Sequence, residues 1–317
     1  VFFGGTERVA RAPRSARIAP STPAPARPRP MSRPAVVVVS SHVARGGVGL
    51  RAAGFALARL GFPVWEVPTV LLPFHPGHGR ATRVVPGAAE FAAMLDDLAA
   101  SRWLGEVGAV LSGYLGEASQ AEAIAGFVAR VKAANPEALY CCDPVIGDDG
   151  GLYVPQATMA AIRDRLLPIA DIATPNRFEL EFLAGAACPD NGALVAAAEA
   201  LGPARVLVSS AHAMMPGAMA TLLVGEGGPI VAEHQAVANA PHGPGDLMAA
   251  LFLGARLAGA DGEKALARTT ASVFEMVVRS ARAGSDELLL AAEQMVLDRP
   301  SAMTSIRRLA VARPRPR

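Results

Sequence analysis

The segment Gly243-Pro244-Gly245-Asp246 contains the residue types that phosphoryl transfer requires, and it runs directly into an apolar stretch. Glycines let the backbone approach a ligand closely, and the first amides of a helix are free to bind an anion. An aspartate in that first turn can accept the proton of a substrate hydroxyl while the amides stabilise the transferred group. Taken alone, the same pattern also fits an aspartate that merely caps a helix.

Two acidic residues follow a short apolar run that is typical of a strand. Asp143 comes directly after the apolar residues 139–142 and precedes Pro144, and Asp148 follows beyond a glycine. Ligands of open α/β sheets bind at the carboxyl ends of the strands, so we expect Asp143 at that edge. Because Mg²⁺ prefers oxygen ligands, the two carboxylates are compatible with a Mg²⁺ site. The alternative is that both are solvated loop acids.

Asn176 and Glu179 stand three residues apart at the expected start of a helix, which places them on one face. Glu179 is a candidate functional carboxylate, and the alternative is a glutamate that the helix dipole favours at an N-terminus.

Alternating short β-branched runs and longer segments with apolar spacing near 3.6 indicate crossover units on a mostly parallel sheet, an α/β fold. We predict strands at 35–40, 64–71, 109–112, 139–142, 169–174 and 205–209. We predict helices at 50–60, 88–101, 118–135, 191–201, 245–257, 263–279 and 285–297. The runs 218–224 and 229–237 flank the Gly-rich turn 225–228 and predict a hairpin.

Residues 1–34 differ from the rest in being rich in Arg, Pro, Ala and Ser, and we predict a disordered arm there, followed by one domain over residues 35–317. An Arg-rich arm also fits a transit peptide, but its proline content argues against that. Met31 directly precedes the first predicted strand, so we expect the natural start at that position.

The composition excludes several classes of protein. Apolar residues make up 51% and charged residues 18%, which indicates a globular chain rather than a disordered one. The formal net charge is only +2 and its basic excess lies in the arm, so we expect no nucleic-acid partner. No apolar run approaches the length of a bilayer span, so we expect no membrane partner, and cysteines without a disulfide framework suit a cytoplasmic protein. Cys141, Cys142 and Cys188 have no metal-binding spacing, and we expect buried, inert thiols.

Several segments resemble the ribokinase superfamily and, within it, the pyridoxal kinases. The chain carries a G-x-G-D segment at 243–246, Ser41-His42-Val43, and Leu111-Ser112-Gly113-Tyr114-Leu115-Gly116. It also carries Cys142-Asp143-Pro144-Val145-Ile146-Gly147-Asp148 and Thr174-Pro175-Asn176-Arg177-Phe178-Glu179. These motifs occur in family order across nearly the whole chain beyond the arm.

The resemblance implies a ribokinase-like three-layer α/β/α sandwich and an ATP-dependent kinase that phosphorylates the 5′-hydroxyl of pyridoxal. It implies Asp246 as the catalytic base, with Gly243 and Gly245 in the anion hole. The substrate-binding residues that it implies are Ser41, Val70, Leu72, His75, Pro76, Tyr114 and Asp246. The ATP-binding residues that it implies are Asp143, Asp148, Thr174, Asn176, Glu179 and Ser209, with Asp143, Asp148 and Glu179 acting on the metal.

The cofactors implied are ATP and Mg²⁺, with a monovalent cation such as K⁺ left open, and the implied assembly is a homodimer. The chain departs from the family pattern at Leu50, Phe74, Pro76 and Pro244, the last of which removes an amide from the anion hole. These departures keep two alternatives open. One is a kinase of the hydroxymethylpyrimidine type, and the other is a non-catalytic, vitamer-binding regulatory protein.

Overall fold

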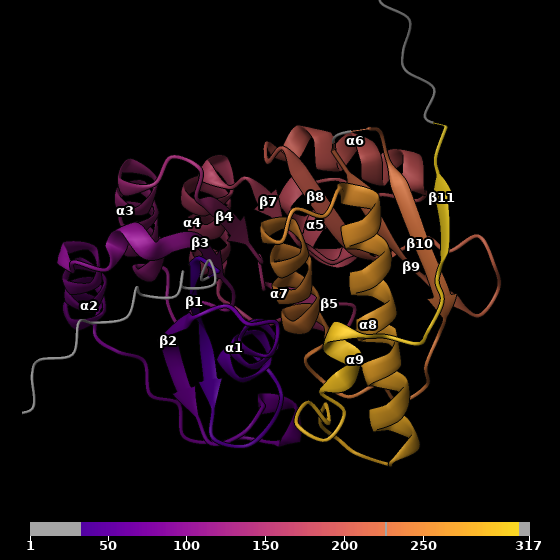
Figure 1. The fold of residues 1–317 in the computed structure, drawn as a ribbon, viewed down its shortest axis with the longest axis horizontal. Helices are drawn as coiled ribbons and strands as arrows, with labels where there is room; N and C mark the ends of the chain where they lie inside the picture. Colours follow the sequence, from indigo (N-terminus) through magenta and orange to yellow (C-terminus); the bar gives the residue numbers. More distant parts are fainter. Residues whose placement is uncertain (1–32, 226, 311–317) are drawn as a thin grey trace, which may run out of the picture. The chain divides into compact units, whose positions relative to one another are not determined.

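The computed structural model describes residues 33–225 and 227–310, and within them nine strands form one sheet (Figure 1). The sheet order is β11-β10-β9-β8-β7-β4-β3-β1-β2. The pairs from β2 to β8 are parallel, and β8 to β11 are antiparallel. The strands are β1 (Ala35–Val43), β2 (Val64–Leu72), β3 (Val107–Ser112), β4 (Leu139–Cys142), β7 (Ile172–Ala173), β8 (Arg205–Ala211), β9 (Ala218–Val224), β10 (Ile230–Gln235) and β11 (Ser305–Arg308).

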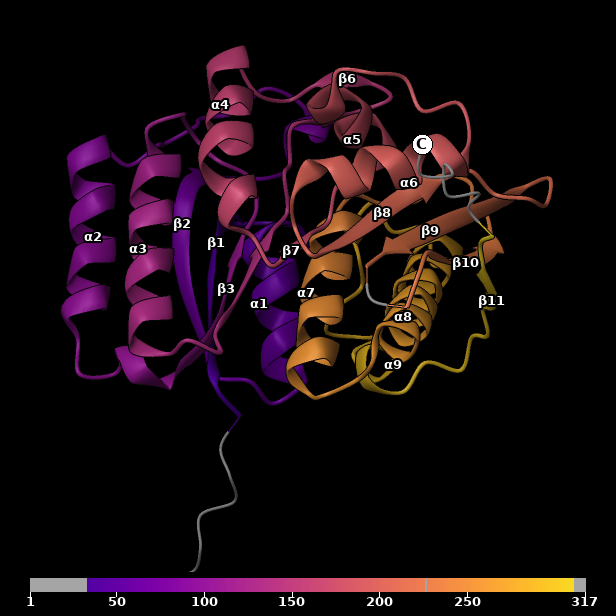
Figure 2. The ribbon, with the colours of Figure 1, turned by 90° about the horizontal axis from the view of Figure 1, so that it is seen from above.

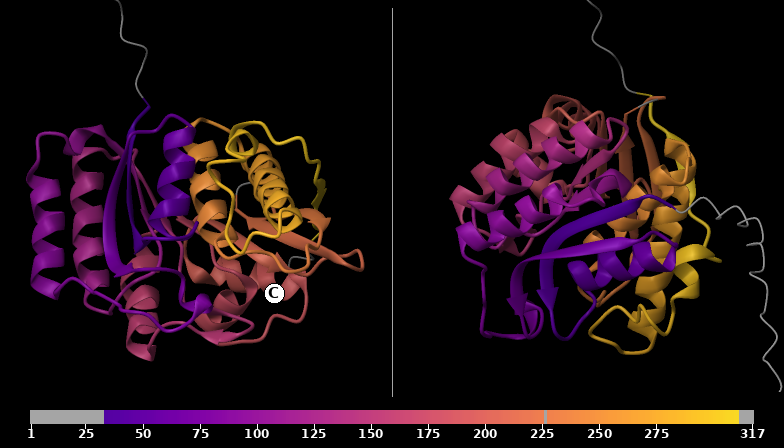
Figure 3. Two further views of the ribbon diagram at one scale, coloured as in Figure 1. Left: turned by 90° about the horizontal axis from the view of Figure 1, so that it is seen from below. Right: turned by 60° about the vertical axis from the view of Figure 1, so that its left-hand side comes forward.

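Two helical layers cover the sheet, so the predicted three-layer α/β/α architecture is confirmed (Figure 2). One layer holds α2 (Ala88–Ala100), α3 (Gln120–Ala134), α4 (Gln156–Ala161), α5 (Arg177–Ala184) and α6 (Asn191–Leu201). The other holds α1 (Leu50–Arg59), α7 (Pro244–Leu257), α8 (Gly262–Arg282) and α9 (Met295–Asp298). Figure 3 shows α1 on one side of β1 and β2, with α2 and α3 on the other.

Each layer forms its own apolar core with one face of the sheet. Phe91 of α2 and Phe127 of α3 pack in the first core, and Leu57 of α1 and Phe252 of α7 pack in the second. The strand β1 contributes to both, because Val37 and Val39 face the first core while Val36 and Val38 face the second. This continuous run of valines is what a parallel strand buried on both faces requires.

Several predicted elements differ from the structure. The predicted helix 285–297 is wrong over most of its length, because only Met295–Asp298 is helical. The predicted strand 169–174 is reduced to Ile172–Ala173, since Leu167–Ile169 forms a 3₁₀ turn. The sequence analysis did not predict α4, β11 or the small hairpin β5 (Gly147–Asp148) and β6 (Gly151–Leu152). The helix predicted at 191–201 has the same bounds in the structure.

The structure also bears on the expectations for the cysteines, the arm and a membrane span. The three cysteines are free and buried, as expected. The predicted arm, residues 1–34, lies outside the described residues except for its last two. Among the described residues, no helix combines the length and apolar character needed to cross a bilayer.

Candidate active site

A cavity of about 820 Å³ opens where the parallel strands end. It is lined by residues of β1, β2 and β8, by the loops after β1, β2, β3, β4, β7 and β10, by the hairpin β5–β6 region, and by the starts of α5 and α7. Of the residues predicted for the site, these line it: Ser41, Leu72, His75, Pro76, Tyr114, Asp143, Asp148, Thr174, Asn176, Glu179, Ser209, Gly243, Gly245 and Asp246. Val70 does not, because its side chain is fully buried beside Ser41 in the β1–β2 ladder.

The catalytic candidate lies in the first turn of α7. Gly243 is the N-cap residue with φ 103°, and a Cβ there would lie 2.1 Å from the carbonyl oxygen of Gly47. Only glycine fits this position, since both the backbone conformation and the space exclude a side chain. Pro244 occupies the first helical position, where a helix leaves the N–H without an internal partner. The amides of Gly245 and Asp246 follow it at the positive end of the helix dipole.

The carboxylate of Asp246 is half-buried and faces the cavity. Burial raises its pKa to about 6, while hydrogen bonds from the amide of Gly49 and from its own amide lower it. A general base works best when its pKa is near the working pH, so this environment suits proton abstraction from a hydroxyl.

Asp143 follows β4 and is almost fully buried. Thr174 Oγ1 donates a 2.8 Å hydrogen bond to Asp143 Oδ1, which fixes the carboxylate. Burial raises the pKa of Asp143 to about 8, with a second contribution from the charge of Asp246 and an opposing one from Thr174. The two carboxylates therefore destabilise each other's charged form in the absence of a cation.

The electrostatics of the cavity fit a divalent cation. Among the described residues that line it there are four carboxylates, Asp143, Asp148, Glu179 and Asp246, and no lysine or arginine. A polyphosphate in such a cavity needs a cation to neutralise it. No ready-made group of three or more metal-binding side chains occurs among the described residues, so the cation would depend on phosphate and water oxygens as well.

Glu179 braces the loop beside Asp143. Its Oε1 accepts hydrogen bonds from the amides of Ile146 and Gly147, at 2.9 and 3.4 Å, and its Oε2 accepts one from Asn176 at 2.8 Å. Asn176 Oδ1 in turn accepts the amide of Glu179, which completes a capping box at the start of α5. Burial raises the pKa of Glu179 well above its usual range. Its action on a metal stays a prediction.

The small hairpin β5–β6 borders the same end of the cavity. Asp148 is exposed there and accepts the amide of Gly150 at 2.7 Å. Asn176 Nδ2 donates to the carbonyl of Gly147 at 2.8 Å, and the amide of Ser209 donates to Pro175 at 3.0 Å. Tyr153 also lines the cavity, and the sequence analysis missed it. Nothing in its neighbouring residues marked it, because its position depends on the hairpin.

At the other end of the cavity, apolar and aromatic groups surround Ser41. Val43, Val48 and Leu72 line this end, together with Tyr114. The amide of Tyr114 donates to Ser40 Oγ at 3.2 Å, which ties the β3 loop to β1. The surface suits a flat aromatic ligand with a few polar groups.

Three histidine rings lie together at this end of the cavity. The rings of His75 and His242 are stacked with centroids 4.0 Å apart, and His78 lies edge-on to both. Burial, as the largest cause, and the neighbouring rings of His242 and His78, as smaller causes, lower the pKa of His75 to about 4. His75 is therefore neutral near pH 7 and offers an aromatic face. Sequence reasoning identified His75 but missed His78 and His242, although His242 adjoins the Gly243-Pro244-Gly245 turn.

Comparisons with known proteins agree with this geometry. Residues 89–290 match the family described as phosphomethylpyrimidine kinase. The chain is 41% identical to the pyridoxal kinase PdxY of Rubrobacter xylanophilus over 282 residues, which cover 87% of this chain and 97% of that protein. It is also 41% identical over 276 residues to the PdxY of Granulibacter bethesdensis, covering 84% and 96%.

Solved structures give the same result. The pyridoxal kinase of Leishmania donovani in complex with ADP superposes with a TM-score of 0.81 at 28% identity, covering 87% of this chain and 99% of that one. The same enzyme with ADP and pyridoxine gives a TM-score of 0.79. The fold is thus the ribokinase-like α/β fold that the motifs implied, and the chain belongs to the pyridoxal kinase family of ATP-dependent kinases.

Proposed function

We propose that this protein transfers the γ-phosphate of ATP to the 5′-hydroxyl of pyridoxal and so forms pyridoxal 5′-phosphate. The observation that carries the proposal is the position of Asp246. Its carboxylate lies in the first turn of α7 and faces a cavity with an acidic end beside Asp143 and an aromatic end beside Ser41. One cavity therefore has room for a nucleotide and a flat vitamer on either side of a single base.

In the proposed reaction, Asp246 accepts the proton of the 5′-hydroxyl as that oxygen forms its bond to the γ-phosphorus. The bond between the γ-phosphorus and the β,γ-bridging oxygen breaks, and ADP leaves. The amides of Gly245 and Asp246 stabilise the charge on the transferred phosphoryl group, with Gly243 shaping the turn. Most of the catalysis is positioning and charge stabilisation, as in other phosphoryl transfers.

The nucleotide occupies the acidic end in this proposal. Thr174, Asn176 and Ser209 would contact it. Asp143 and Asp148 would hold Mg²⁺ together with the phosphates, and Glu179, which keeps residues 146–147 in place, would also act on the metal. When bound, Mg²⁺ neutralises phosphate charge that no lysine or arginine among the described lining residues offsets. A monovalent cation such as K⁺ belongs to the same proposal.

The vitamer occupies the aromatic end. The hydroxyl of Ser41 hydrogen-bonds the pyridine ring, Leu72 and Tyr114 flank it, and the neutral ring of His75 faces it beside Pro76. We also propose that residues 35–317 form one kinase domain, that it works as a homodimer, and that it acts in the cytoplasm. Both apolar cores rest on one sheet, which supports the single domain.

The matched family description supports a second candidate, a kinase acting on a hydroxymethylpyrimidine. A panel of pyridoxal, pyridoxamine, pyridoxine and hydroxymethylpyrimidine, each with ATP and Mg²⁺ in an assay coupled to ADP release, separates the two. We expect the highest kcat/KM for a pyridine substrate. A preference for the pyrimidine would overturn the proposal, and binding without ADP release would favour a regulatory protein.

A further inference from the structure

The side chain of Glu287 joins loops that border both parts of the cavity. We propose that Glu287 is a positioning residue that sets the catalytic turn and the substrate loop relative to each other, an inference that rests on the proposed function. The substrate loop is here residues 73–79, after β2. Glu287 itself does not line the cavity.

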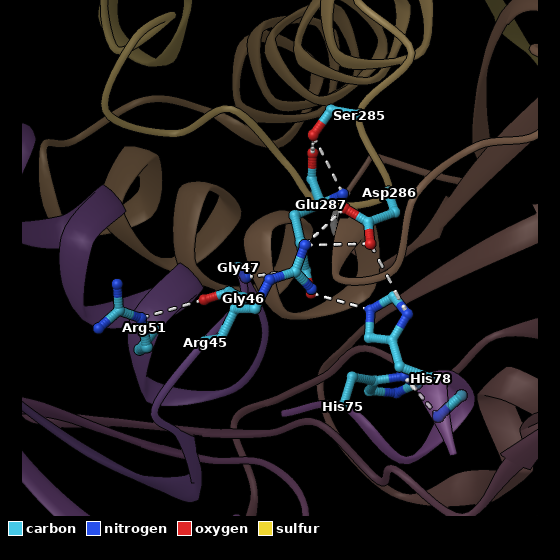
Figure 4. A network of polar contacts seen from close by, with 10 residues as sticks. Arg45, Gly46, Gly47, Arg51, His75, His78, Ser285, Asp286 and Glu287 are labelled. Carbon is cyan, nitrogen blue, oxygen red and sulfur yellow. Dashed lines mark hydrogen bonds and ion pairs between the residues drawn. The ribbon is translucent and has the colours of Figure 1, made fainter. Parts of the chain in front are cut away.

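The contacts of Glu287 are those of a buried carboxylate with several donors (Figure 4). Its Oε2 accepts the amide of Gly47 at 3.0 Å, and its Oε1 lies 3.3 Å from Arg45 Nη1 and 3.0 Å from His78 Nε2. The residue is only 9% exposed. Hydrogen bonds to a buried charge are stronger than neutral ones, so this carboxylate holds its partners firmly.

One path, meaning a series of direct contacts, connects Glu287 to the catalytic base Asp246. The bond to Gly47 fixes the loop between β1 and α1, and the carbonyl of Gly47 lies against the α-carbon of Gly243, where a Cβ would approach it to 2.1 Å. Gly49, two residues further along the same loop, presents its amide to Asp246 and so lowers the pKa of that carboxyl. The backbone of Glu287 also pairs with that of His242 in an isolated bridge, just before Gly243.

A second path leads to the vitamer end. His78 is the last residue of the 3₁₀ helix Pro76–His78, and His75 caps its start by accepting the amide of Gly77 at 3.1 Å. His75 in turn stacks on His242. The contact between Glu287 and His78 therefore anchors the loop that presents His75 to the cavity.

These contacts also explain why the predicted helix at 285–297 does not begin at Ser285. The amide of Glu287 donates to Ser285 Oγ at 3.2 Å, and Ser285 Oγ donates to the carbonyl of Glu287 at 2.7 Å. This local turn aims the carboxylate back at Gly47 and His78. If residues 285–287 were helical, the carboxylate of Glu287 would no longer be available to Gly47 and His78.

The two paths can be separated by substitution. In Glu287→Gln the amide oxygen still accepts from Gly47, but the amide nitrogen cannot accept from Arg45 and can bond His78 Nε2 only if that nitrogen gives up its proton. We expect kcat to stay within about twofold while KM for pyridoxal rises by about threefold or more, the scale of a lost charged hydrogen bond that is partly screened. In Glu287→Ala both paths are lost, and we expect kcat to fall by about tenfold or more in addition, because small misplacements of reacting groups are costly.

His78→Asn tests the second path alone and should reproduce the rise in KM with little change in kcat. The double variant Glu287→Gln with His78→Asn should be no worse in KM than either single one. The matched control is Asp286→Asn, since Asp286 also pairs with Arg45 and lies 3.9 Å from His78 Nδ1, but is exposed and does not contact Gly47. We expect its kinetics to match the wild type.

Thermal melting of each variant identifies any general loss of folding, and the dissociation constant of pyridoxal, from fluorescence titration, gives a readout that needs no turnover. Equal kcat and KM in Glu287→Gln, Glu287→Ala and the wild type would overturn the positioning role. Additive effects of His78→Asn and Glu287→Gln would remove the path through His78. A wild type that binds pyridoxal without phosphorylating it would defeat the proposed function, while the dissociation constants would still test Glu287.

Discussion

The negative charge of Asp246 is, after burial, the second cause that raises the pKa of the Asp143 carboxyl to about 8. The two residues are far apart in sequence, one after β4 and the other in the first turn of α7, yet they share one cavity. Two negative charges in one cavity make the site receptive to a cation, and burial raises the pKa of the base, Asp246, to about 6.

Activity should fall on acidification with a midpoint near pH 6, because burial raises the pKa of Asp246 to about that value and only its ionised form can accept a proton. Below the midpoint kcat/KM for pyridoxal should drop about tenfold per pH unit. The measurement is kcat/KM against pH at subsaturating ATP. Pyridoxine ionises differently from pyridoxal, but its kcat/KM should fall on acidification with the same midpoint. A midpoint that differs between the two substrates would show that Asp246 is not the cause of the fall.

Glu179→Ala should lower the free energy of unfolding by about 2 kcal/mol or more, since it removes a capping box and leaves buried amides of Ile146 and Gly147 without their acceptor. Urea unfolding followed by circular dichroism measures this. Glu199→Ala, an exposed glutamate of α6, is the control and should change stability little. Equal effects of the two substitutions would contradict the bracing role.

Pro244→Thr should raise the turnover number. A threonine at the first position of α7 adds an amide beside the proposed phosphoryl site, and a well-aimed donor there can contribute up to about 2–4 kcal/mol, with less where solvent already supplies part of it. We expect a smaller gain. Proline also rigidifies this turn, so an unchanged or reduced kcat at saturating ATP, with KM for pyridoxal unshifted, would show that rigidity matters more than the added donor.

Removing residues 1–30 should change neither the melting temperature nor the activity. The buried apolar residues of the described structure begin at Ala35, and Arg33, which stacks on the ring of Phe62 at 4.6 Å from its centroid, is retained. Differential scanning calorimetry and the kinase assay on a chain starting at Met31 check this. A lower melting temperature or a changed association state would show that the arm contributes to the fold or to an interface.

Sequence patterns predicted the strands and helices whose formation depends on residues that are close in sequence. The valine run in β1 is recognisable because a strand buried on both faces needs continuous apolar residues. The helix 191–201 is recognisable from its apolar spacing, and in the structure Asp190 caps it by accepting the amide of Ala193 at 2.8 Å. The residues predicted from the strand-end motifs line one cavity because parallel strands end at one edge.

The parts that failed depend on contacts between distant segments. Periodicity favoured a helix at 285–297, but Glu287 is held by Gly47 and His78, which no local pattern reveals. Val70 lies next to Ser41 in the β1–β2 register, yet the pleat turns it into the core, so proximity to the site did not mean access to it. His242 and Tyr153 reach the cavity only through loop conformations that the folded chain determines.

The most direct test of the account is the ATP-dependent formation of pyridoxal 5′-phosphate by the wild type and by Asp246→Asn, separated by chromatography and measured at saturating ATP, Mg²⁺ and pyridoxal. We predict that the substitution leaves the melting temperature and ATP affinity nearly unchanged and lowers kcat by a factor of roughly 10² to 10⁴, the range for loss of a general base. An Asp246→Asn protein that retains most of its turnover, or a wild type that forms no pyridoxal 5′-phosphate, would contradict it.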